Sequence, residues 1–139
     1  MEYWNKQTKK SIDRMLNPKS VAIIGASDNK SYGGRFMAKA LSSEGELRVY
    51  PVNPNSDVIQ GVIADKRVLD LPEVPDTAAI LVPFNFVLPT LDQCHKKGIT
   101  SAIVISAGFA ERGVKERGDL QNELTLFTQR TGLRISGPN

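Results

Sequence analysis

The sequence predicts an α/β fold of Rossmann type, a doubly wound parallel sheet of about five strands in a single domain. Two observations lead to this prediction. Short apolar runs, rich in β-branched residues and without polar alternation, recur along the chain, as is typical of strands covered on both faces. Stretches with helical spacing lie between several of them. Strand, helix and strand at such intervals form βαβ units, whose right-handed crossovers give a parallel sheet.

Five segments are predicted to be strands. They are residues 20–25, 48–52, 77–82, 101–106 and 134–136. The first ends in a glycine, and the last is short. Between the second and third strands the pattern is weaker, because Pro72 and Pro75 interrupt it. We expect a short strand or turn near Val62, followed by a loop.

Three segments have the apolar spacing of amphipathic helices. Their apolar stripes are Phe36, Met37, Ala40 and Leu41; Val87, Leu88, Leu91, Cys94 and His95; and Leu120, Leu124 and Phe127. The second helix is predicted to end in a cationic turn capped by Gly98, and the third is followed by Gly132. In this pattern Cys94 is expected to be a buried, small apolar residue, and His95 to lie at the core edge or surface.

Length and composition indicate an ordinary globular domain. A chain of 139 residues fits one domain that buries its own core. One cysteine excludes a disulfide framework and favours a reducing compartment. No apolar run reaches the roughly 18 residues of a membrane span, and the N-terminus lacks the apolar stretch of a signal peptide. We therefore expect a cytoplasmic protein without membrane contact.

The positive charge of the chain is concentrated at its N-terminus. The net charge is +3, and residues 1–19 alone account for all of it, which leaves residues 20–139 neutral. Proteins that read nucleic acid usually carry their basic stripe on the folded face. We therefore predict a solvated basic leader over residues 1–17, a domain over residues 18–139, and no nucleic-acid partner.

Ligands of open parallel sheets bind beyond the carboxyl ends of the strands, which directs attention to four loops. The first covers residues 25–35 and joins a strand to a helix, where backbone N–H groups and the helix dipole favour a phosphate. Glycines such as Gly34 would let the backbone approach the ligand, and Ser27 and Ser31 would add hydrogen bonds. The loop is neither Gly-x-Gly-x-x-Gly nor a Walker A sequence. A plain strand-to-helix turn is the alternative.

The second loop has Asn53 and Asn55 where binders of NAD usually place a carboxylate for the ribose hydroxyls. The missing charge would suit a ligand with a ribose phosphate. Asn-Pro is also a common turn starter, which is the alternative. Four cations are candidates for the countercharge, although each is more simply explained as solvated: Lys30, Arg35, Lys66 and Arg67.

The third and fourth loops offer a slot for a base or an aliphatic arm. Pro83 and Phe84 are candidates to line it, although Phe84 is equally well explained as a core residue. Residues 106–108 supply small side chains and backbone N–H groups beside such an arm. Glu111 is a lone loop carboxylate, and we expect it to be solvated.

Four motifs together resemble a known family. They are residues 18–27 (PKSVAIIGAS), 50–54 (YPVNP), 104–109 (VISAGF) and 137–139 (GPN). In this order they resemble the N-terminal CoA-binding domain of NDP-forming acyl-CoA synthetases, relatives of the α subunit of succinyl-CoA synthetase, from about residue 10 onward. The resemblance implies that the first loop holds CoA phosphates, the second contacts the adenosine end and the later loops hold the pantetheine arm. By position it implies these cofactor-binding residues: Gly25, Ala26, Ser27, Gly34, Arg35, Asn53, Asn55, Pro83, Ile105, Ser106 and Ala107.

The resemblance implies a CoA- or acyl-CoA-binding domain whose partners are the remaining synthetase domains or subunit, of ATP-grasp type. The family's phosphorylated histidine cannot be assigned to His95, so we expect neither catalytic residues nor a metal site, and no synthetase activity from this sequence alone. The family's Gly-Pro-Asn motif normally continues into a second domain, whereas the sequence ends at Asn139. Two alternatives remain open: a stand-alone CoA-binding regulatory protein, and an NAD(P)-binding module of a redox enzyme.

Overall fold

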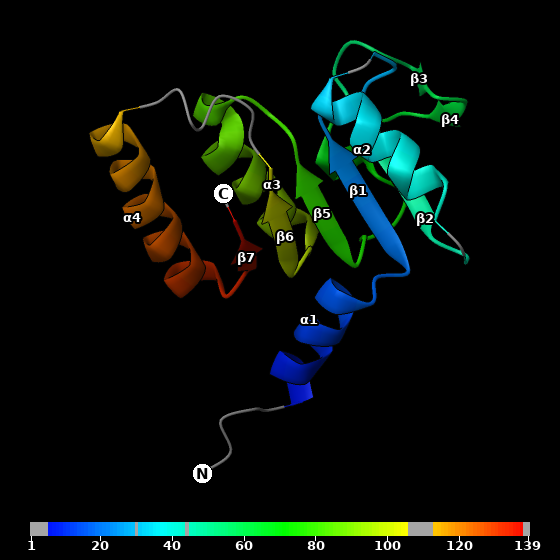
Figure 1. Ribbon diagram of the computed structural model, residues 1–139. Helices are drawn as coiled ribbons and strands as arrows, with labels where there is room; N and C mark the ends of the chain where they lie inside the picture. The colour runs from blue at the N-terminus through cyan, green and yellow to red at the C-terminus, as the bar shows by residue number, and fades with distance from the viewer. Residues whose placement is uncertain (1–5, 30, 44, 106–112, 138–139) are drawn as a thin grey trace.

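The computed structural model describes residues 6–29, 31–43, 45–105 and 113–137. Within these residues, five parallel strands form a sheet in the order β2–β1–β5–β6–β7 (Figure 1). The strands are β1 (Ser20–Ile24), β2 (Arg48–Val52), β5 (Thr77–Ile80), β6 (Ser101–Val104) and β7 (Arg134–Ser136). The predicted fold class is confirmed, and each predicted strand is present.

Three of the strands end slightly earlier than predicted. β1 stops before Gly25, which turns the chain with a φ of +96°. Beyond β5 and β6, Leu81 and Ile105 still donate backbone hydrogen bonds of 2.8 Å to the carbonyls of Ile24 and Ile80. Backbone pairing therefore continues one residue beyond the ends of β5 and β6.

Helices cover both faces of the sheet. They are α2 (Tyr32–Leu41), α3 (Val87–Lys97) and α4 (Val114–Thr131), as predicted, and a further helix α1 (Lys6–Leu16). The side chains of β1 alternate between two core clusters. Ala22 and Ile24 pack in the cluster that contains the buried residues of α3 and α4, whereas Val21 and Ile23 pack with Met37 of α2. This alternation is the physical basis of the doubly wound arrangement.

The predicted helix ends are also confirmed. Gly98 follows α3 with a φ of +100°, and Gly132 follows α4 with a φ of +74°. Both left-handed caps return backbone hydrogen bonds to the last turn, from Gly98 to His95 and from Gly132 to Thr128. Cys94 is fully buried, as expected, and His95 is exposed.

The N-terminal segment contains a helix that the sequence analysis did not predict. Its described basic side chains are exposed, as expected, but residues 6–16 form the helix α1, which contacts β6 and projects from the amino end of β1 (Figure 1). Met15 and Pro18 line an apolar cavity of about 360 Å³ together with Phe36 and Ala40 of α2. The sequence prediction missed this helix because most of its positions are polar and only a narrow stripe contacts the domain.

The segment between β2 and β5 contains a small hairpin. β3 (Val58–Ile59) and β4 (Val62–Ile63) pair in antiparallel fashion around Gln60 and Gly61, which have φ values of +49° and +80°. Positive φ at both turn positions is typical of a type I′ hairpin. The expected short strand or turn near Val62 is therefore confirmed. A 3₁₀ turn, η1 (Val68–Asp70), leads back to β5, and another, η2 (Phe84–Phe86), precedes α3.

Candidate functional site

A pocket of about 420 Å³ opens at the carboxyl ends of β1, β2 and β5. The chain leaves β1 toward β2 on one side, whereas β5 is followed by β6 on the other. The pocket therefore lies at the topological switch point, where open α/β sheets bind their ligands. Its lining includes Gly25, Asn53, Pro54, Asn55, Lys66, Arg67, Leu81, Val82, Pro83, Phe86, Thr90 and Gln93.

The glycines of the first loop are required by the loop itself. A Cβ on Gly25 would collide with the carbonyl oxygen of Leu81, and a Cβ on Gly34 would collide with the carbonyl oxygen of Asn29. We had expected Gly34 to leave room for a ligand phosphate. The structure gives a different physical reason for this glycine, because the loop backbone occupies the space of the missing side chain.

The polar side chains of the first loop are bonded to one another. Ser27 Oγ donates to Asn29 Oδ1 over 2.7 Å, and the backbone N–H of Ser31 donates to the same oxygen over 2.9 Å. The Ser27 and Ser31 hydroxyl oxygens lie 3.2 Å apart. These hydrogen bonds shape the loop from within, whether or not it binds a ligand.

Asn53 joins the first and second loops. Its side-chain nitrogen donates to the carbonyl oxygen of Ala26 over 2.9 Å, and its side-chain oxygen accepts the backbone N–H of Asn55 over 2.8 Å. The second bond is an Asx-turn, which agrees with the interpretation of Asn53 as a turn starter. A carboxylate could not donate to Ala26, and its charge would face a carbonyl oxygen. The structure therefore explains why an amide stands here.

The hairpin supplies a contact that sequence reasoning missed. The side-chain nitrogen of Gln60 donates to the carbonyl oxygens of Ser27 and Gly34 over 3.0 and 2.8 Å. The backbone N–H of Gln60 donates to Asp28 Oδ1 over 2.6 Å. The repeated Val-Ile pairs around Gln60-Gly61 could have indicated the hairpin, but nothing in the sequence shows which loop the glutamine reaches.

Two of the four candidate cations line the pocket. Lys66 Nζ lies 2.8 Å from Asp57 Oδ1, and Arg67 lies 3.1 Å from Asp70 Oδ1. Hydrogen bonds from these cations hold the pKa of the Asp57 carboxyl and the pKa of the Asp70 carboxyl below their usual values. The four side chains are 43% to 88% exposed, so water screens both pairs and each contributes little to stability.

Only some of the predicted site residues line the pocket. Arg35 is exposed on α2, Ile105 is half-buried beyond the end of β6, and neither lines the pocket. Ser106, Ala107, Glu111 and Lys30 lie outside the described residues. The pocket therefore unites Gly25, Asn53, Asn55 and Pro83. Ala26 accepts a hydrogen bond from the lining residue Asn53, whereas Ser27 and Gly34 accept theirs from Gln60, which does not line the pocket.

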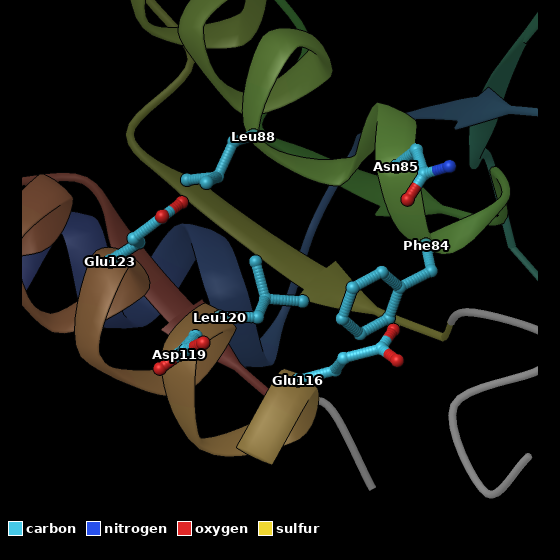
Figure 2. A pocket seen from close by; sticks show the side chains of 7 residues that line it. All are labelled: Phe84, Asn85, Leu88, Glu116, Asp119, Leu120 and Glu123. Atoms are coloured by element: carbon cyan, nitrogen blue, oxygen red, sulfur yellow. The ribbon is translucent and has the colours of Figure 1, made fainter. Parts of the chain in front are cut away.

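Phe84 and Phe86, which lie just before α3, line two different cavities. Phe86 lines the pocket with 59% of its surface exposed. Phe84 packs against the main core and lines a smaller cavity of about 290 Å³ between α3 and α4, where Figure 2 shows its ring turned toward Leu120 with Glu116 beside it. Because Glu116, Asp119 and Glu123 surround this second cavity, its potential disfavours an anionic ligand. Phe86, which the sequence analysis did not single out, is therefore the phenylalanine that lines the pocket.

Other classes of site find little support in the described part of the chain. Its His, Cys, Asp and Glu side chains form no group of three or more that could hold a metal ion. No helix among the described residues is long and apolar enough to cross a bilayer.

Comparison with known proteins shows the family of the chain. The family model described as "CoA binding domain" matches residues 19–139. The chain is 38% identical over 128 residues to the α subunit of an ADP-forming acetate–CoA ligase II of Pyrococcus furiosus, covering 92% of this chain and 28% of that protein. It is 43% identical over 123 residues to an ADP-forming acetate–CoA ligase of Methanocaldococcus jannaschii, covering 88% and 17%.

A solved structure is similar as well. An acetyl-coenzyme A synthetase of Ca. Korarchaeum cryptofilum, in complex with phosphate and ADP, superimposes with a TM-score of 0.83 at 35% identity, covering 94% of this chain and 28% of that one. The chain thus spans less than a third of the length of these three relatives. It belongs to the CoA binding domain family and is related to one part of the ADP-forming acetate–CoA ligases.

Proposed function

We propose that this chain binds coenzyme A or acyl-CoA in the pocket at the carboxyl ends of β1, β2 and β5. The observation that carries the proposal is the position of this pocket at the switch point, in a chain of the CoA binding domain family. Its volume of about 420 Å³ suits part of a large, extended cofactor. The rest of CoA would extend across the rim, where the first loop lies.

The charges around the pocket support an anionic ligand with a ribose phosphate. Lys66 and Arg67 face the same space as Asn53 and Asn55. In the proposed complex these cations leave Asp57 and Asp70 and contact the 3′-phosphate of CoA. A charge-assisted hydrogen bond contributes about 1.5–3 kcal/mol, and about 1.4 kcal/mol corresponds to a tenfold change in affinity. One such contact would therefore separate CoA from dephospho-CoA.

The wider role follows from the relatives. We propose that the domain positions CoA for an NDP-forming acyl-CoA synthetase, with the remaining synthetase domains or subunit, of ATP-grasp type, as its partners. The relatives named as ADP-forming acetate–CoA ligases support this reading. A cytoplasmic location fits the single buried thiol of Cys94, which a reducing compartment keeps free.

The test is a calorimetric comparison of CoA, dephospho-CoA, NAD and NADP at one ionic strength. We expect CoA to bind most tightly and dephospho-CoA about tenfold more weakly, with a smaller salt dependence because one phosphate contact is lost. NAD should bind poorly, because Asn53 provides no carboxylate for its ribose hydroxyls. NAD binding as tight as that of CoA, or no CoA signal at millimolar concentration, would refute the proposal.

A matched pair of variants sharpens this test. The double variant Lys66→Gln with Arg67→Gln should weaken CoA about tenfold or more and affect dephospho-CoA much less. The control is Arg48→Gln, because Arg48 is also exposed and ion-paired, to Glu73 at 3.0 Å, but lies at the amino end of β2. Equal losses for both ligands in the double variant would show that the two cations do not read the 3′-phosphate.

A further inference from the structure

The side chain of Gln60 lies between the hairpin and the first loop and contacts that loop in two places. Its nitrogen donates to Ser27 O over 3.0 Å and to Gly34 O over 2.8 Å, so it joins the start of the loop to the first turn of α2. The two carbonyls are seven residues apart in sequence, yet one amide group holds both. Gln60, a residue of the β3–β4 hairpin, therefore links the two ends of the first loop through hydrogen bonds.

These hydrogen bonds fix the direction of peptide groups. In a trans peptide the C=O and the following N–H point in opposite directions. Asn53 holds the carbonyl of Ala26, and Gln60 holds the carbonyl of Ser27. The N–H of Ser27 consequently points away from the Asn53 amide, and the N–H of Asp28 points away from the Gln60 amide. Backbone N–H groups fixed at successive positions of a loop can form a concavity that binds phosphate.

Gln60 also holds the acidic side chain of the loop. Its backbone N–H donates to Asp28 Oδ1 over 2.6 Å, which keeps this carboxylate on the hairpin side. In the described part of the chain, Gln60 is the one non-glycine residue with positive φ, at +49°. A glycine would adopt this conformation at lower cost but would lack the side chain that reaches Ser27 and Gly34.

We propose that Gln60 is a positioning residue of the phosphate loop: through its bonds to Ser27 and Gly34 it orients the loop N–H groups toward the pyrophosphate of CoA. The inference rests on the proposed function, and it names the hairpin as part of the binding site. It predicts that changes at Gln60 affect ligands that carry a pyrophosphate and spare ligands that lack one.

The experiment uses two variants of the full chain. Gln60→Glu keeps the shape but places a carboxylate oxygen against two carbonyl oxygens, and Gln60→Gly removes the side chain while keeping the backbone N–H to Asp28 and the positive φ. Gln129→Glu, at an exposed position of α4, is the control for the charge change. Affinity is measured for CoA and for adenosine 3′-phosphate, which has no pyrophosphate. Nitrogen-15 spectra of the free proteins report on the amides of Ser27 and Asp28.

We expect both Gln60 variants to bind CoA about tenfold more weakly and to bind adenosine 3′-phosphate within about twofold of the wild type. The amide resonances of Ser27 and Asp28 should shift, and the control should match the wild type. CoA affinity within about twofold of the wild type in both Gln60 variants would overturn the inference, as would equal losses for the two ligands. If the wild-type chain itself fails to bind CoA, the proposed function fails first. Should Gln60→Glu not fold, Gln60→Gly alone decides.

Discussion

At the scale of single residues, two amides do what a carboxylate could not. Asn53 and Gln60 both donate to backbone carbonyls of the first loop, over 2.8 to 3.0 Å. An acid at either position would place negative charge against a carbonyl oxygen of the first loop. The departure from the dinucleotide-binding pattern at Asn53 is therefore a property of the loop's internal bonding, quite apart from any ligand that it favours.

The buried thiol of Cys94 has a strongly shifted pKa. Burial raises the pKa of this thiol to about 12. At pH 8 the native thiol should react with a disulfide reagent orders of magnitude more slowly than in denaturant, because the thiolate is the nucleophile. Above about pH 9 the unfolded thiol ionises while the native thiol stays neutral, so this group lowers stability progressively as pH rises toward about 12.

Thiol titration with and without guanidinium measures the difference in reactivity. A Cys94→Ala variant serves as the control for the pH dependence of unfolding. Rapid labelling of the native chain at pH 8 would contradict the burial of Cys94 in the cluster under α3 and α4.

At the scale of elements, glycines act differently according to their backbone conformation. α4 contains Gly118 in its interior and ends at Gly132, and a Cβ at either glycine would meet no atom within 4 Å. Packing therefore plays no part in a change to alanine at these two positions. The two glycines differ in φ, because Gly132 has the left-handed value of +74° and Gly118 is helical.

Alanine should accordingly have opposite effects at the two sites. Gly118→Ala should stabilise the domain by about 0.5–1 kcal/mol, because the unfolded chain loses freedom and the helix gains propensity. Gly132→Ala should destabilise it by about 1–2 kcal/mol, because an L-residue is strained in the left-handed region. Urea unfolding of both variants measures these changes, and effects of the same sign would contradict the helix end at Gly132.

At the scale of the whole molecule, the strand order determines where the pocket lies. β1 and β5 are neighbours with crossovers that diverge, so their loops separate and leave a space that side chains only partly fill.

His95, the single histidine of the sequence, lies on a different face of α3 from the pocket residues Thr90 and Gln93. Its ring packs edge-on against Phe127 of α4, with the ring centroids 6.4 Å apart.

From the position of His95 we predict that the chain binds CoA but does not catalyse thioester formation. The purified chain should bind CoA but form no thioester with ATP and a panel of short-chain and aromatic acids, because His95 does not face the pocket. Detection of acyl-CoA by mass spectrometry is the measurement, with a complete acyl-CoA synthetase as positive control. Sustained turnover by this chain alone would require an active site elsewhere in it.

Patterns of neighbouring residues were sufficient to predict most of the helices and strands. β2 covers the predicted residues 48–52, and Gly98 and Gly132 end their helices, because apolar periodicity and left-handed caps are encoded by neighbouring residues. α1 was missed because polar positions dominate its sequence. The carboxyl edge was predicted as the site from the βαβ order alone, and the pocket with Gly25, Asn53 and Pro83 lies there.

The sequence by itself predicted the five strands of the parallel sheet, the helices α2, α3 and α4, and the edge where the loops meet, because apolar periodicity and turn residues are local features of the chain. Only the tertiary structure shows which residues of these loops contact one another and which of them line the pocket. Asn53 reaches Ala26 across 27 positions and Gln60 reaches Ser27 across 33, and Phe86 takes the place at the pocket that Phe84 was a candidate for. Such contacts depend on how the hairpin folds back over the first loop, and no local pattern encodes that path. The physical reason is that an amide side chain has the same local preferences whether its partner is a loop carbonyl or water.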